Sequence, residues 1–159
     1  MSSIEALIDI DQTESAEIRI DPITGNRSLF SRKFFQKGEV IMDFLAKSVQ
    51  STPTYLTVQV GETEHIELFP DCLACANHSC DPNCFFDTTS MQFVCVKNIA
   101  EGEEFTFFYP SAEWDMNQPF KCDCGSNDCI DYIRGAKYLS QDSIAKYRFT
   151  DFIQLKLKG

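Results

Sequence analysis

Three cysteines near the end of the chain restrict its folding more than any other feature. Cys122, Cys124 and Cys129 form a Cys-x-Cys-x4-Cys cluster, and Gly125 supplies a turn that lets neighbouring thiols point at one centre. The residues between them are polar, so three buried structural thiols would not explain the cluster. Thiolates held this close repel each other unless a cation lies between them. A structural zinc site is therefore favoured, and it requires a fourth ligand from elsewhere in the chain.

A fourth ligand is available in the segment NHSCDPNC, at residues 77–84. This segment offers three donors that zinc accepts, Cys80, Cys84 and His78, and the residue types alone do not choose among them. The N-terminus does not resemble a secretory signal. The eight cysteines are therefore expected to be metal ligands or buried thiols rather than a disulfide framework.

The same segment has a second interpretation, centred on its Asp81-Pro82 turn. Exposed turns often collect Asn and Ser for local hydrogen bonding, which explains Asn83. It does not explain Asn77 and His78, which precede the turn. Their side chains, with freed backbone N–H groups, suit a polar ligand such as an amino acid or an adenine ring. Composition supports the two interpretations equally.

Short runs of β-branched and aromatic residues, separated by turn residues, predict a mostly β fold. The runs cover residues 28–35, 39–45, 54–60, 64–69, 91–96 and 104–109. Only one segment predicts a helix: an apolar stripe at helical spacing begins near Asp142 and extends to Leu155. The acidic start of the chain, through about Glu17, is either a loose arm or an edge strand.

Tyr109 ends the strand-like run GEEFTFFYP, at residues 102–110. This run is either a core strand with an aromatic plug or a strand that presents the Tyr109 hydroxyl in an aromatic-lined slot, and the pattern does not decide. His65, within another strand-like run, is expected to be a surface or hydrogen-bonded strand histidine. Trp114 is expected to be a packing anchor.

Length and charge limit the class of partner. At 159 residues and 43% hydrophobic, the chain suits a single domain. The net charge is −10, and residues 132–159 are basic on balance, so the rest of the chain is more strongly acidic. Such a surface repels nucleic acid and attracts basic protein segments, although it serves solubility equally well. No apolar run approaches the roughly 20 residues of a membrane span, so we expect a soluble, intracellular protein without direct nucleic-acid or membrane contact.

Taken in order, four segments resemble the SET domain of protein-lysine methyltransferases and its trailing post-SET zinc segment. They are QKGEVIMDF at residues 36–44, NHSCDPNC at 77–84, GEEFTFFYP at 102–110 and CDCGSNDC at 122–129. The resemblance implies short β-sheets with a knot-like crossing of the chain. It also implies an acidic N-terminal arm (1–16), a SET domain (17–112), a post-SET zinc segment (113–138) and a C-terminal helix (139–159).

The resemblance implies a role for each residue left unexplained above. It implies that the Asn77-His78 pair holds S-adenosylmethionine next to Tyr109, the active-site tyrosine. The implied zinc ligands are Cys80, Cys122, Cys124 and Cys129. The other implied cofactor-binding residues are Asn26, Arg27, Ser28, Tyr55, Tyr132 and Ile133, the last two packing against adenine and closing the lysine channel.

Two positions qualify the implied activity. Phe107 matches the family's phenylalanine/tyrosine switch position, where phenylalanine leaves room and omits a hydroxyl, so more than one methyl group is expected on the acceptor. The stretch Asn26-Arg27-Ser28 replaces the family's Gly-x-Gly cofactor motif. It distinguishes an active methyltransferase from the alternative, a catalytically inactive SET module that binds a basic protein segment.

The resemblance implies lysine side chains of a protein as methyl acceptors. The stretch between Tyr55 and Asn77 is short, without the helical insert that forms one wall of the peptide groove in many relatives. Either a partner or a second copy of the chain, in a homo-oligomer, supplies that wall, or the acceptor is a small-molecule amine. The sequence leaves both nuclear and cytoplasmic residence open.

Overall fold

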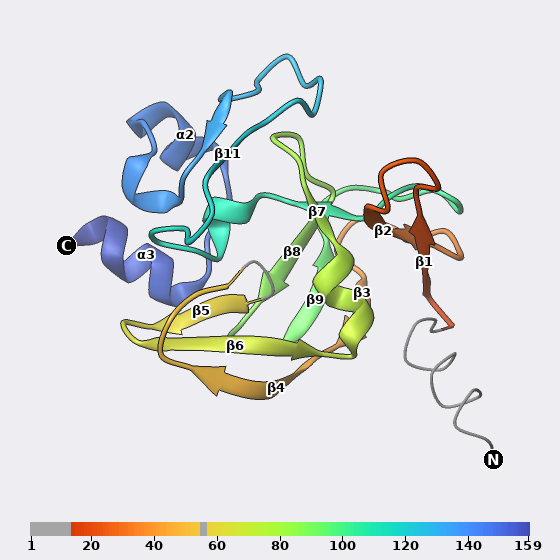
Figure 1. Cartoon of the computed structure of the whole chain (residues 1–159), viewed down its shortest axis with the longest axis horizontal. Helices are drawn as coiled ribbons and strands as arrows, with labels where there is room; N and C mark the ends of the chain where they lie inside the picture. Colours follow the sequence, from red (N-terminus) through yellow and green to blue (C-terminus); the bar gives the residue numbers. More distant parts are fainter. Residues whose placement is uncertain (1–13, 55–56) are drawn as a thin grey trace.

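The computed structural model describes residues 14–54 and 57–159. Within them the chain forms four small β-sheets, with the helices gathered at one end (Figure 1). The sequence prediction of a mostly β fold is confirmed. No helix in the described ranges combines the length and the apolar character that crossing a membrane requires.

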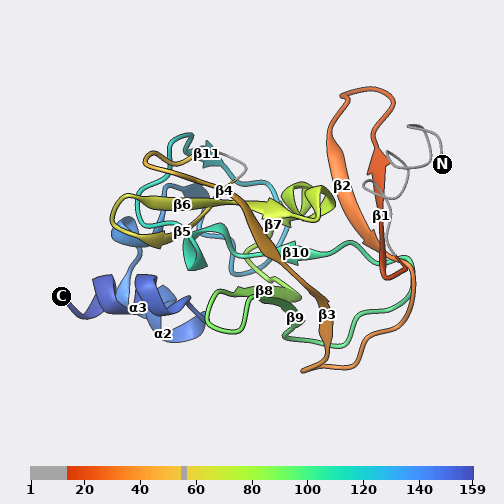
Figure 2. The ribbon, with the colours of Figure 1, turned by 90° about the horizontal axis from the view of Figure 1, so that it is seen from below.

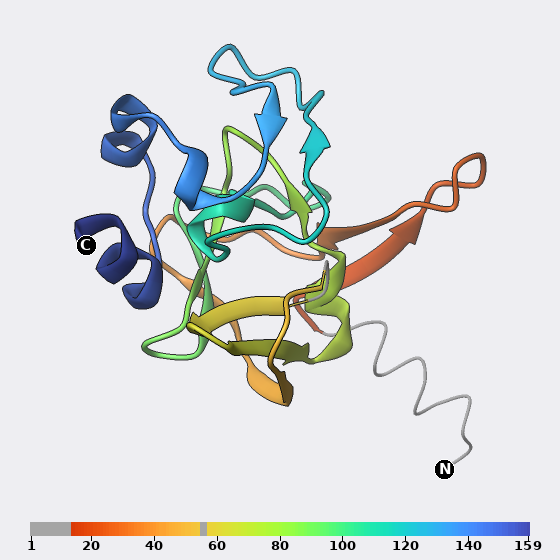
Figure 3. The same cartoon turned by 60° about the vertical axis from the view of Figure 1, so that its left-hand side comes forward.

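An antiparallel hairpin begins the described chain. It consists of β1 (Ala16–Ile20) and β2 (Arg27–Ser31), with Ala16 opposite Ser31. The hairpin projects from the other sheets in Figures 2 and 3. Strand β2 joins it to them: the backbone N–H of Phe105 donates to the carbonyl of Leu29 at 2.8 Å, so the hairpin is tied to the strand that precedes Tyr109.

A three-stranded antiparallel sheet forms one wall of the molecule. Its order is β4 (Leu45–Gln50), β6 (Glu64–Phe69) and β5 (Thr57–Gly61). The single-residue alternation of β6 buries Ile66 and Leu68 in the main core. The 3₁₀ turn η1 (Asp71–Cys75) follows β6 and leads the chain back toward the hairpin.

The five-stranded sheet contains the two segments that sequence analysis singled out. Its order is β3 (Val40–Asp43), β9 (Gln92–Cys95), β8 (Cys84–Asp87), β10 (Thr106–Phe107) and β7 (Asn77–His78). Strand β10 pairs in parallel with both β7 and β8. Residues some 30 positions apart in sequence are thus neighbours, a pairing that needs the chain to cross over.

The C-terminal part contains two helices, so the prediction of one continuous helix from Asp142 to Leu155 is wrong. The elements are η2 (Tyr109–Ser111), β11 (Phe120–Lys121), β12 (Tyr132–Ile133), η3 (Ala136–Tyr138), α2 (Gln141–Lys146) and α3 (Asp151–Lys158). The chain turns between the helices because the ring of Tyr147 stacks on Phe108, with centroids 3.7 Å apart, and the N–H of Thr150 donates to the carbonyl of Ser111.

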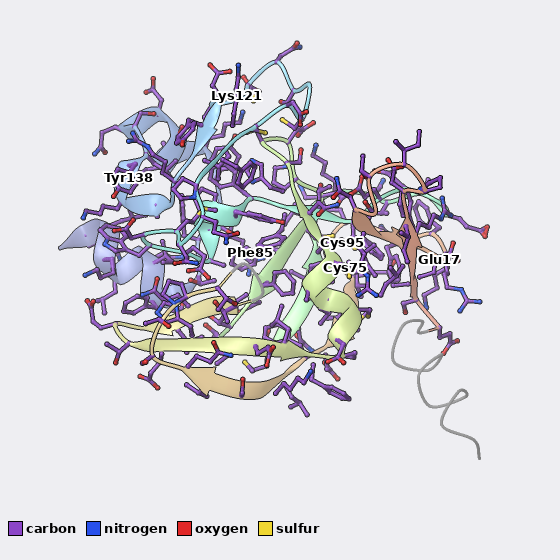
Figure 4. All side chains as sticks on the ribbon, in the orientation of Figure 1. Glu17, Cys75, Phe85, Cys95, Lys121 and Tyr138 are labelled. Carbon is purple, nitrogen blue, oxygen red and sulfur yellow. The ribbon has the colours of Figure 1, made fainter. Side chains whose placement is uncertain are left out.

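Two hydrophobic cores support this arrangement. The larger lies between the sheets and is dominated by phenylalanines, among them Phe44, Phe86 and Phe93. The smaller joins the thiol cluster to the C-terminal helices through Phe108 and Ile153. In Figure 4 the labelled Phe85 lies within the body of the protein, whereas Glu17 lies out on the hairpin.

Candidate functional site

The parallel pairing of β7 with β10 places Tyr109 against His78. In this pairing His78 lies opposite Phe107, and the N–H of Ser79 donates to the carbonyl of Phe107 at 3.1 Å. Two residues further, the backbone N–H of Tyr109 donates to Nδ1 of His78 at 3.1 Å, and the two rings meet edge to face with centroids 5.2 Å apart. The Tyr109 hydroxyl donates to the carbonyl of Ala76 at 3.3 Å.

The hydrogen bonds of His78 fix its tautomer and connect two parts of the site. Burial lowers the pKa of His78 to about 4, so the ring is neutral at pH 7. Because Nδ1 accepts from Tyr109, the proton is assigned to Nε2, which lies 3.3 Å from Sγ of Cys80. One imidazole therefore links the tyrosine to the thiol cluster.

The Asn77 side chain ties the hairpin to the same place. Its Nδ2 lies within hydrogen-bond distance of three acceptors, the carbonyl of Arg27 at 3.1 Å, Oγ of Ser28 at 3.0 Å and Oε2 of Glu104 at 3.1 Å. Ser28 stands where the family motif has glycine, and here its hydroxyl contacts the asparagine. In the turn between β1 and β2, the residue with a left-handed backbone conformation is Gly25, whose φ is 76°.

These residues line one large cavity. Its volume is about 1070 Å³, slightly above the roughly 300–1,000 Å³ that small-molecule sites occupy. Of the residues expected to bind cofactor or act in catalysis, the cavity is lined by Asn26, Arg27, Ser28, Asn77, His78, Phe107 and Tyr109. Tyr55 lies outside the described residues, although Thr54 and Thr57 on either side of it line the cavity.

Aromatic rings surround the Tyr109 phenol. The rings of Phe107 and Phe120 lie with centroids 4.7 and 5.8 Å from that of Tyr109. Burial, with a smaller contribution from the Glu104 carboxylate, raises the pKa of Tyr109 to about 12. The phenol therefore keeps its proton at neutral pH and is available as a hydrogen-bond donor.

The four predicted zinc ligands come together. Their sulfur atoms, in Cys80, Cys122, Cys124 and Cys129, all lie within 4.8 Å of one another. A tetrahedral zinc site has Zn–S distances of about 2.3 Å, which place its sulfurs about 3.8 Å apart. The donor set therefore fits zinc. Cys84, the alternative ligand, lies instead opposite Cys95 in the β8–β9 pair.

Burial opposes ionisation of two of the four clustered thiols. It raises the pKa of Cys80 strongly and that of Cys122 to about 11. These two thiols would be protonated at neutral pH without an ion, whereas a coordinated zinc ion holds thiols in the thiolate form.

Tyr132 and Ile133, expected beside the cofactor, are not among the residues that line the cavity. Ile133 is fully buried in the smaller core, and Tyr132 is 52% exposed. Both belong to β12, which pairs with β11, and on this side Met116 and Phe120 line the cavity. Sequence reasoning missed those two residues, and the apolar positions in DMNQPF, just before the first clustered cysteine, were the available signal.

Two acidic residues of the cavity wall were also missed. Glu104 contacts Asn77, and Glu113 is buried four residues after Tyr109. The second Glu of GEEF and the lone Glu before Trp114 gave no pattern that separates them from surface acids. His65, expected at the surface or hydrogen-bonded, is buried and its Nδ1 has no hydrogen-bond partner in the described structure.

Comparisons with known proteins agree on a family. A family model described as SET domain matches residues 26–110, more than half of the chain. The methyltransferase flvH of Aspergillus flavus is 39% identical over 108 residues, which are 67% of this chain and 60% of flvH. A histone-lysine N-methyltransferase of Schizosaccharomyces pombe, H3 lysine-36 specific, is 38% identical over 65 residues, 37% of this chain and 8% of that protein. This chain thus spans less than two thirds of either relative.

A solved structure shows the same fold. The crystal structure of KRYPTONITE, in complex with mCHH DNA, an H3(1-15) peptide and SAH, superposes with a TM-score of 0.54 over 74% of this chain and 29% of that one, at 17% sequence identity. That likeness confirms the SET-like fold. The motifs at residues 77–78 and 107–109 lie inside the segment that the family model matches, and this chain belongs to the SET domain family.

Proposed function

We propose that this chain is an S-adenosylmethionine-dependent methyltransferase whose acceptor is an amine, with protein lysine side chains as the first candidate. The observation that carries the proposal is the pairing of β7 with β10, which sets Tyr109 against His78 in one cavity wall. The relatives support it, since one is named a methyltransferase, one a histone-lysine N-methyltransferase, and the KRYPTONITE complex contains SAH.

The cavity end beside the hairpin suits the amino-acid part of the methyl donor. Arg27, whose backbone carbonyl accepts from Asn77, lines the cavity and provides a cation for a carboxylate, and the Glu104 carboxylate beside the Asn77 amide provides an anion for an ammonium group. Asn26 and Ser28 line the same end. These residues, with Tyr55, His78, Tyr132 and Ile133, remain the proposed cofactor-binding set, although the last two would need a different side-chain arrangement to reach the cavity.

Bound S-adenosylmethionine supplies an electrophilic methyl group on a positively charged sulfur. The protonated Tyr109 phenol contributes a fixed dipole beside the reacting atoms. A free lysine amine, with a pKa of about 10.4, is mostly protonated at pH 7, and the rings of Phe107 and Phe120 favour its neutral form by excluding water. Phe107 adds no hydroxyl that would fill the space a second methyl group needs.

The proposed metal is a structural zinc ion held by Cys80, Cys122, Cys124 and Cys129. Four sulfurs close the coordination sphere, so the ion holds the chain in place and leaves no position for water or substrate. Zinc fixes the segment that carries Phe120 against the strand end that carries His78. The site therefore supports the cavity without taking part in methyl transfer.

A basic partner suits the acidic surface, and a lysine-containing protein inside the cell, in the nucleus or the cytoplasm, is the proposed substrate. A small-molecule amine is the second candidate. The structure between Thr57 and Asn77 is taken up by β5, β6 and η1, which leaves no helical insert in these described residues to form a wall of a peptide groove.

Calorimetry and a labelling assay test the proposal together. Wild type should bind S-adenosylmethionine and transfer labelled methyl groups either to lysate proteins or to free amines. Tyr109→Phe should retain binding and lose most of the transfer. A wild-type protein that gives no heat with S-adenosylmethionine and no label would instead be an inactive SET module that binds a basic segment.

A further inference from the structure

Glu113 has a rigidly held place in the cavity wall. The carbonyl of Ala112 accepts from the N–H of Gln59, and the Gln59 side-chain oxygen accepts from the N–H of Trp114, both at 2.9 Å. On the other side the N–H of Ala136 donates to the carbonyl of Glu113, also at 2.9 Å. The backbone at Glu113 is therefore held against β5 and against η3, which fixes the direction of its Cα–Cβ bond.

Neither oxygen of the Glu113 carboxyl meets a donor at hydrogen-bond distance among the described residues, and the nearby Thr57 side chain only opposes the rise in its pKa. Both oxygens are buried, and Nδ1 of His65, itself unpartnered, lies 3.9 Å from Oε2. That distance is too long for a hydrogen bond. Buried polar groups in native proteins are nearly always satisfied, so an isolated carboxyl beside a cavity indicates a missing donor.

The charge state of this pair supports that conclusion. Burial raises the pKa of Glu113 to about 8 and lowers the pKa of His65. Near neutral pH the pair is thus mostly an uncharged acid beside a neutral imidazole. No ion pair between them offsets the free-energy cost of burying both groups. A cation arriving in the cavity would favour the ionised carboxylate.

The rest of the cavity favours a cationic ligand as well. Among the described residues that line it, the acidic side chains are Asp21, Glu104, Glu113 and Asp123, and the guanidinium of Arg27 is the one permanently charged basic group. Glu104 and Arg27 lie beside Asn77 at the proposed donor end. Glu113 lines the same cavity as Thr57 and Val58 of β5.

We propose that Glu113 binds the methyl acceptor, and that the acceptor is a primary or secondary aliphatic amine whose N–H group supplies the missing donor to this carboxyl. The inference rests on the proposed methyltransferase function. When the amine enters as an ammonium ion, Glu113 first releases its own proton to solvent. One proton then passes from the ammonium nitrogen to a carboxylate oxygen, which leaves a neutral amine and a carboxylic acid. A lysine side chain in a protein and a small free amine share this chemistry.

Glu113→Gln is the test, because glutamine keeps the shape and removes the acid. Glu101→Gln is the matched control, since Glu101 is exposed and outside the cavity wall. SAH binding by calorimetry and thermal unfolding show whether each variant is folded with an intact donor site. Both variants should bind SAH within twofold of wild type, and Glu113→Gln should unfold at the same or a higher temperature because it loses an unpaired buried acid.

Acceptor binding is then measured without requiring turnover. n-Butylamine and a lysine-containing peptide are titrated separately into each SAH complex. The compound whose binding depends on Glu113 shows whether the acceptor is a small free amine or a lysine side chain in a protein. Glu113→Gln should weaken binding of that acceptor at least tenfold, and raise its KM similarly wherever turnover is seen, while Glu101→Gln changes neither. An equal affinity of wild type and Glu113→Gln for both acceptors, or no amine binding to wild type, overturns the inference. Glu113-dependent amine binding without methyl transfer would leave it standing and refute the proposed function instead.

Discussion

Replacement of Cys80 by serine tests how the thiol cluster supports the site. The sulfurs lie within 4.8 Å of one another, so closing on zinc to separations of about 3.8 Å requires shifts of only about 1 Å. Structural zinc binds with an apparent free energy on the order of 10 kcal/mol at neutral pH, and that energy is also folding energy. With one thiolate gone, we expect Cys80→Ser to release the ion and to lower the free energy of unfolding by at least about 4 kcal/mol, the size that loss of a metal site reaches.

Cys84→Ser is the matched control for this experiment. Cys84 is as buried as Cys80, but it lies in β8, and its thiol donates to Oδ1 of Asn83, a contact that a serine hydroxyl can replace. The assay is zinc content per chain by elemental mass spectrometry, followed by thermal unfolding. For a chain of this size 4 kcal/mol lowers the midpoint by about 8–16 °C. One zinc ion per chain in Cys80→Ser, as in Cys84→Ser, would refute the ligand assignment.

The remaining predictions concern the cavity and the junction behind it. Tyr109→Phe loses the hydrogen bond to Ala76, so stability should change by about 1 kcal/mol or less, while turnover in the labelling assay falls about 100-fold; full activity would remove the phenol from the mechanism. Phe107→Tyr adds a hydroxyl beside Tyr109 and should restrict the product to one methyl group, as mass spectra of the product show, whereas unchanged higher methylation would contradict the switch role. Gly135→Ala places a Cβ 2.5 Å from the carbonyl oxygen of Trp114 at a φ of 121°, and should destabilise the protein by at least about 2 kcal/mol in thermal unfolding; a neutral effect would show that this junction is not rigid.

The sequence predicted those parts of the site whose chemistry depends on residues within one short segment. The spacing of the clustered cysteines favours a metal ion whatever the fold, and the Asn77-His78 pair stands out because neither side chain suits a core position. The role of Tyr109 could not be predicted from its own segment. Pattern alone left it as either a plug or a presented hydroxyl, and the choice depends on the long-range pairing of β7 with β10.

The features that sequence missed depend on tertiary contacts. The apolar stripe after Asp142 has helical spacing throughout, yet the chain breaks because Tyr147 stacks on Phe108 and donates from its hydroxyl to the carbonyl of Cys80 at 2.7 Å. Glu113 is buried only because its backbone is held by β5 and η3. A single-sequence pattern contains neither contact, so local propensity predicted a longer helix and gave no signal for Glu113.

The hydrogen bond from Tyr147 to the carbonyl of Cys80 can form only late in synthesis of the chain. Its two ends are 67 residues apart, and ribosomes add roughly 5–20 residues per second. Synthesis therefore adds Tyr147 about 3–13 s after Cys80. During that interval neither this hydrogen bond nor the stacking of Tyr147 on Phe108 holds the C-terminal segment against the site.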